Sequence, residues 1–236
     1  MPGWAARGPD AMPDLQLVDL VRNGTMSAEI AATLAAAAEE RRSFLVFAVP
    51  RLAGKSTVMH AVLGRVPRGT PVRTATGEPD EIERLGRRDG RGYLLIPEIS
   101  RAPVPGYLWG APVRRVFGLL ERGYALAAAL HAPDVEEAFA IVCAGNGVPD
   151  AHAARVQLAV SIRSLGDWQA PTRRVVEAVH EVHGVERGQP RARALHLWDE
   201  ARDRFVSVNE PKVVDAERWA RLAVAFARAA VARPPA

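Results

Sequence analysis

The tetrapeptide GKST at positions 54–57 has the residue types and spacing of a phosphate-binding loop. It follows the apolar run FLVFAV (44–49) and opens a helical pattern over 55–63, so it marks a turn from a buried strand into a helix. There, backbone N–H groups face the phosphates, the lysine reaches the terminal phosphates, and the Ser56 hydroxyl binds Mg²⁺. A chance match at a helix start is the alternative. The residues predicted to bind ATP are Ala53, Gly54, Lys55, Ser56 and Thr57.

Lysine is rare in this chain, which uses arginine for nearly all of its positive charge. The two lysines are Lys55 and Lys212. A compact, flexible ammonium suits a phosphate loop in which an arginine fork would not fit. Lys55 is therefore the predicted principal contact to the phosphates.

Glu98 is a candidate ligand for the magnesium ion. It follows YLLI (93–96) and Pro97, so it lies where a second apolar strand ends. A carboxylate there can hold Mg²⁺, directly or through water, or polarise the attacking water. The alternative is a solvated glutamate in the turn after a strand.

His131 follows the apolar run YALAAAL (124–130) directly. A histidine at the carboxyl end of a parallel strand could sense the terminal phosphate or relay a proton. The alternative is a loop histidine packed on a helix cap.

Strand and helix patterns alternate along the chain. Helices are expected at 14–22, 27–42, 55–63, 112–122, 134–143, 150–164 and 215–232. Strands are expected at 44–49, 72–76, 93–96, 124–130, 173–182, 194–200 and 204–208. This alternation predicts an α/β fold with a mainly parallel sheet flanked by helices, a small C-terminal β extension and a terminal helix.

We expect four regions along the chain. They are a flexible leader (1–13), an N-terminal helical lead-in (14–42), a nucleotide-binding core (43–170) and a C-terminal part with strands and an amphipathic helix (171–236).

Composition excludes several classes of protein. The net charge is only +4 over 236 residues, with no long basic run, so nucleic acid is not an expected partner. Cys143 is the single cysteine and is expected to be a buried, inert thiol in a reducing, cytoplasmic setting. No apolar run reaches the roughly 18 residues of a membrane span.

His180 and His183 fall on opposite faces of a strand, which favours structural roles over a metal pair.

From Leu17 to Gly166 the chain resembles the secretion ATPases of type II and type IV secretion and type IV pilus systems, which are RecA-like P-loop motors. TATGEPDE looks like the family's acidic box, which implies a catalytic role for Glu78. YLLIPEIS looks like its Walker B strand with Glu98, and ERGYALAAALHAPDVEEAF is similar to its histidine box with His131. LVDLVRNGTMSAEIAATLAAAAEERRSFLV looks like the lead-in to the first motor strand, and RVQLAVSIRSL like the helix after the histidine box.

The chain departs from this family at its Walker A loop. Val49 stands where the family begins the loop with glycine, and Pro50, Arg51, Leu52 and Ala53 replace a small, glycine-rich interior. A β-branched residue disfavours positive φ, and proline lacks an N–H that could face the anion. We also expect the family's N-terminal sensing domain to be absent. Weak nucleotide binding and slow or absent hydrolysis are the expected results.

The resemblance implies an Mg-ATP-binding motor ATPase that works with components of a secretion or pilus machine, as a homo- or hetero-oligomer. The alternative is a nucleotide-binding but catalytically degenerate assembly or regulatory subunit of such a machine. A small-molecule kinase would need an arginine-rich lid, which the sequence lacks. No Asn/Thr-Lys-x-Asp motif for guanine occurs, which favours adenine.

Overall fold

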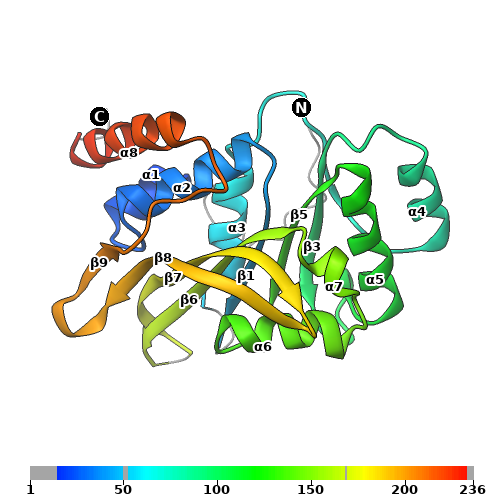
Figure 1. Cartoon of the computed structure of the whole chain (residues 1–236). Helices are drawn as coiled ribbons and strands as arrows, with labels where there is room; N and C mark the ends of the chain where they lie inside the picture. Colours follow the sequence, from blue (N-terminus) through cyan, green and yellow to red (C-terminus); the bar gives the residue numbers. More distant parts are fainter. Residues whose placement is uncertain (1–14, 50–52, 168, 233–236) are drawn as a thin grey trace.

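The computed structural model describes residues 15–49, 53–167 and 169–232. Within these residues nine strands form one sheet in the order β2-β3-β5-β1-β6-β7-β8-β9, and the short strand β4 pairs with β3 (Figure 1). The strands from β2 to β6 in this order are parallel. The last three are antiparallel and extend the sheet at one side. The expected α/β fold is confirmed.

The strands are β1 (Ser43–Ala48), β2 (Val72–Thr74), β3 (Tyr93–Ile99), β4 (Tyr107–Leu108), β5 (Ala125–Leu130), β6 (Val156–Gly166), β7 (Pro171–Glu186), β8 (Gln189–Asp199) and β9 (Arg204–Ser207). The α-helices are α1 (Leu17–Arg22), α2 (Ala28–Glu39), α3 (Lys55–Leu63), α4 (Pro79–Gly86), α5 (Ala111–Gly118), α6 (Val135–Ala140), α7 (Asp150–Ala153) and α8 (Ala216–Val231). A 3₁₀ turn (Leu119–Arg122) continues α5, and a π turn (Ile141–Gly145) continues α6.

The helices form a layer on each face of the sheet. One apolar core lies between the sheet and α1, α2, α3 and α8, and the other between the sheet and α4 to α7. Strand β1 lies between β5 and β6 and sends Phe44 and Val46 into the first core and Leu45 and Phe47 into the second. A strand buried on both faces needs an unbroken apolar run.

Most of the expected helices and strands are confirmed, and α3 begins and ends at the expected residues. Ser27 caps α2 and Asp134 caps α6, each accepting a hydrogen bond from the backbone N–H three residues later. Helix α4 was not expected. The leader over 1–13 lies outside the described residues.

The expected helix over 150–164 is wrong, and so is the likeness of RVQLAVSIRSL to a helix. Only the first four residues are helical, and strand β6 follows. Val156, Leu158, Val160 and Ile162 alternate with other residues at the two-residue period of a strand. Pairing with β1 on one side and β7 on the other then fixes this segment as an inner strand.

The C-terminal helix α8 packs on the N-terminal helices. Trp219, Leu222 and Phe226 contribute to the first core, whereas Val224 from the same expected stripe is exposed. The Trp219 indole donates a hydrogen bond to the Thr33 hydroxyl at 3.0 Å, which links α8 to α2.

Two further expectations concern burial and membranes. Cys143 is buried, and the loss of solvent raises the pKa of its thiol to about 11, with Asp150 as a second cause. Among the helices that the structure describes, none combines the length and the apolar character needed to cross a bilayer.

The cap of α2 leads to a stability prediction. Ser27→Ala should lower the free energy of unfolding by about 1 kcal/mol, because it removes the acceptor for the Ile30 N–H. Urea unfolding measures this change. Ser56→Ala is the matched control, since no side chain caps the first turn of α3. Equal losses for the two variants would contradict the assigned cap.

Candidate phosphate site at the carboxyl edge of the sheet

The carboxyl ends of three neighbouring parallel strands bring Lys55, Glu98 and His131 together. Lys55 begins the helix that follows β1, Glu98 lies near the end of β3, and His131 follows β5. Strand β5 lies between β1 and β3, so all three side chains meet at one edge. This edge is where open α/β sheets bind their ligands.

The three side chains are in direct contact. The Lys55 ammonium lies 3.4 Å from Oε2 of Glu98 and 3.2 Å from Nε2 of His131. Nε2 of His131 lies 3.8 Å from Oε1 of Glu98. The lysine and glutamate side chains are almost fully buried, whereas the histidine is 36% exposed. The cluster is therefore a buried ion pair in contact with a partly exposed histidine.

Both ring nitrogens of His131 have close polar neighbours. Nδ1 lies 3.2 Å from the Ala48 carbonyl oxygen at the end of β1 and 3.3 Å from the Lys55 ammonium. A carbonyl oxygen only accepts and an ammonium only donates, so the tautomer decides which of these two contacts is a hydrogen bond. With the proton on Nδ1, Nε2 can accept from Lys55 at 3.2 Å. The end of β1 and the lysine thus hold the ring from the same side.

Among the described residues, one oxygen of Glu98 has no hydrogen-bond partner. Oε1 is buried, and the residue as a whole is 6% exposed. A buried carboxylate oxygen without a donor costs free energy, so such an atom calls for an explanation in terms of an ion, a water molecule or a ligand. Its position beside Lys55 makes it available to a metal ion or to a water molecule.

The start of α3 suits an anion. Gly54 occupies the position before the helix with φ +95°, a left-handed conformation that glycine adopts without strain. No side chain caps the first turn and no acidic residue lies in it, whereas Ser27, Asp134 and Asp215 cap α2, α6 and α8. The positive end of the helix dipole is thus left for a ligand.

The other predicted site residues are placed as follows. Ala53 is buried, Ser56 is exposed on the first turn of α3, and Thr57 is half-buried beside it. Glu78 is exposed at the residue before α4 and, among the described residues, makes no hydrogen bond or ion pair with the cluster. The turn before α4 is instead organised by Glu81, which accepts from the N–H groups of Thr76 and Gly77.

The departures in the loop are seen only in part, because Pro50, Arg51 and Leu52 lie outside the described residues. Val49 is 53% exposed. Among the described residues other than glycine, positive φ occurs at Arg41, Arg187 and Asp203 only, so Val49 carries no such strain.

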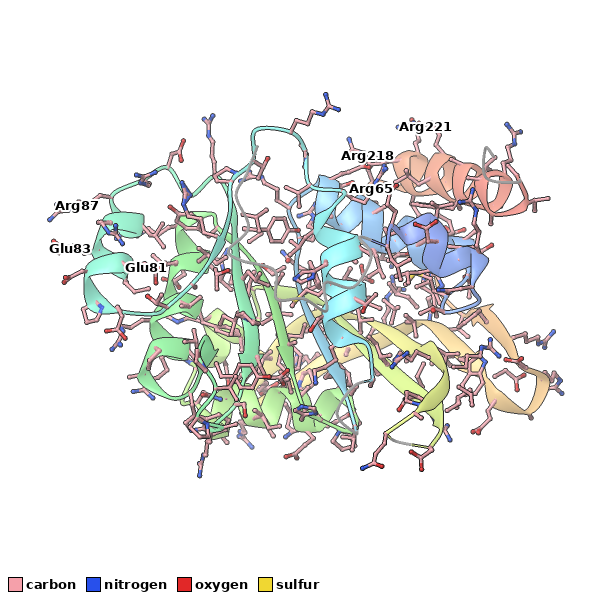
Figure 2. The ribbon with its side chains drawn as sticks, turned by 180° about the vertical axis from the view of Figure 1, so that it is seen from behind. Arg65, Glu81, Glu83, Arg87, Arg218 and Arg221 are labelled. Atoms are coloured by element: carbon pink, nitrogen blue, oxygen red, sulfur yellow. The ribbon has the colours of Figure 1, made fainter. Side chains whose placement is uncertain are left out.

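Two surface grooves lie away from the cluster. One of about 660 Å³ lies between the C-terminal end of α3 and α8, where Figure 2 shows Arg65, Arg218 and Arg221. Each of these arginines has an acidic partner, in Glu39, Glu40 and Glu217 respectively. The other, of about 410 Å³, lies between α4 and α5 and is lined by Glu83 and Arg87, which pair with each other. The labelled arginines of both grooves are thus paired with acidic side chains.

Histidines elsewhere do not form a metal site. His183 is exposed beside Glu181, and burial lowers the pKa of His180. Within the described ranges, no group of three or more His, Cys, Asp or Glu side chains is arranged to hold a metal ion.

No family model matches the sequence, and no curated protein matches it. Among solved structures, the chain is similar to the VirB11 ATPase from the Brucella suis type IV secretion system, crystallised in complex with sulphate. The identity is 18% and the TM-score 0.47, over 72% of this chain and 57% of that chain. The chain thus spans little more than half of that structure.

Proposed function

We propose that this protein binds Mg-ATP at the start of α3 and hydrolyses it slowly, as a RecA-like ATPase of the secretion or pilus type. The observation that carries the proposal is the cluster at the carboxyl edge, in which a buried lysine at a helix N-terminus faces a glutamate with one unpartnered oxygen. The sequence motifs support the link to secretion and pilus machines.

The residues present fit a magnesium nucleotide. The Lys55 ammonium would contact the terminal phosphates, together with the backbone N–H groups that begin α3. The Ser56 hydroxyl and the free oxygen of Glu98 would hold Mg²⁺, directly or through water. When bound, Mg²⁺ neutralises charge on the phosphates.

Glu98 has a second task in this proposal. A bound phosphate would attract the Lys55 ammonium. Oε2 of Glu98 would then lose the ammonium that pairs with it. The carboxylate is then available to accept a proton from water. His131, fixed by Ala48, faces the same space and can bond to the phosphate or to that water.

The central test is the affinity for Mg-ATP measured by calorimetry. Lys55→Ala should weaken binding at least tenfold, the scale of a lost charge-assisted contact of about 1.5–3 kcal/mol. Lys212→Ala removes the only other lysine, which is exposed in the C-terminal part, and should leave affinity unchanged. Removing Mg²⁺ with EDTA should also weaken ATP binding. Equal affinities for the wild type and Lys55→Ala would contradict the proposal.

A second candidate function is nucleotide binding without turnover, in an assembly or regulatory subunit. It is favoured by the 3.4 Å contact between Lys55 and Glu98, because the ion pair occupies the carboxylate oxygen that would have to approach the attacking water. A turnover assay on the protein that binds ATP distinguishes the two. A rate near the roughly 1 s⁻¹ of ordinary enzymes supports the motor ATPase, and a rate at the background level supports the subunit.

A further inference from the structure

Arg174 lies beside the start of α3 although it is distant in sequence. In the antiparallel pairing of β6 with β7 it faces Ser164, two residues beyond the Ile162 that pairs with Ala48 at the end of β1. This register carries Arg174 to the carboxyl edge, level with the chain that leaves β1. The half-buried side chain reaches that chain, since a Cβ atom added to Gly54 would lie 2.9 Å from its Cδ and 3.7 Å from its Nε.

This arrangement places two cationic side chains at the start of α3. Lys55, which pairs with Glu98, and Arg174 both lie at the positive end of the α3 dipole, and the first turn of α3 holds no acidic residue. Cations at a helix N-terminus are unfavourable, and an anion there reverses the sign of the interaction. An arginine fork also matches the spacing of phosphate oxygens.

The neighbouring arginine is held differently. Arg173 pairs with Asp203 at 2.7 Å and donates to the Gly24 carbonyl at 3.1 Å, so it ties β7 to the turn after α1 and to the turn between β8 and β9. The two adjacent arginines therefore have distinct surroundings, and Arg174 is the one directed at the phosphate loop.

We propose that Arg174 is a second cationic ligand for the phosphate chain, supplied by β7 beside Lys55. This inference rests on the proposed function, because the phosphate chain is that of the bound nucleotide. It assigns to the antiparallel extension a direct part in the site, beyond its part in the fold.

The experiment uses calorimetry with two probes, sodium tripolyphosphate and Mg-ATP. Arg174→Met keeps an unbranched stem against Gly54 and removes the charge, and should weaken the binding of both probes at least tenfold. Arg174→Lys should recover part of this loss. Arg191→Met is the matched control, because Arg191 lies exposed on β8 and pairs with Glu186. It should change affinity less than twofold. Thermal unfolding of each variant checks that the fold is intact.

The outcomes separate the two proposals. If Arg174→Met binds both probes as tightly as the wild type and Lys55→Ala binds them more weakly, the role of Arg174 is overturned and the proposed function stands. Equal losses in Arg174→Met and Arg191→Met show a general charge effect and also overturn the role. If the wild type binds neither probe, the proposed function fails and the role of Arg174 fails with it.

Discussion

Glu98→Gln is expected to lower ATP turnover by roughly 100-fold or more, the usual contribution of a general base. The amide cannot take a proton from water, yet it fills the same buried space beside Lys55. Affinity for ATP should be kept or increased, because Lys55 no longer has a carboxylate partner that competes with the phosphates. Steady-state phosphate release and calorimetry measure the two effects.

Glu83→Gln is the matched control for this change. Glu83 is exposed on α4 and pairs with Arg87, as the labelled side chains of Figure 2 show. The ATP turnover of the Glu83→Gln variant should equal that of the wild type. A Glu98→Gln variant that turns over ATP at the wild-type rate would remove Glu98 from the chemistry, and an equal loss in Glu83→Gln would point to a general effect of charge.

The protein should lose stability as the pH falls from 6.5 toward 4, because of His196. This side chain is 1% exposed and lies between the hydroxyls of Thr33 and Ser207, each at 2.9 Å. Burial lowers its pKa to about 4, against a smaller opposite effect of Glu29. Below pH 6.5 the unfolded chain therefore binds a proton that the folded chain does not. This difference removes about 3 kcal/mol of stability by pH 4.

Urea unfolding at pH 7.5, 6.0 and 5.0 tests this expectation. His180 also has a lowered pKa, so the informative quantity is the difference between the wild type and His196→Gln. The variant should show a flatter decline, whatever its stability at pH 7.5. Parallel declines in the two proteins would show that His196 does not titrate as described.

Sequence patterns predict the parallel part of this fold well because its signals are local. A strand buried on both faces appears as a continuous apolar run, and GKST at 54–57 marks the start of α3. The meeting of Lys55, Glu98 and His131 also follows, since carboxyl ends of parallel strands share an edge. Such patterns do not predict the ion pair between Lys55 and Glu98 at 3.4 Å.

The features that escape prediction depend on pairing between distant segments. The β6 segment mixes apolar and polar residues in a way that either a strand or a helix could accommodate, and its two neighbours decide the outcome. Arg174 approaches Gly54 only through the register of β6 and β7. No residue near position 174 indicates that the phosphate loop is its neighbour.

The central position of β1 bears on how the chain folds during synthesis. Its two partners are β5, which begins at Ala125, and β6, which begins at Val156, so a ribosome releases this very apolar segment long before it can be paired. Helix α2 is synthesised even longer before its partner α8, which supplies the Trp219 contact. Non-local pairing of this kind slows folding and exposes aggregation-prone surface. Until α8 emerges, the nascent chain therefore exposes apolar surface that the folded protein buries.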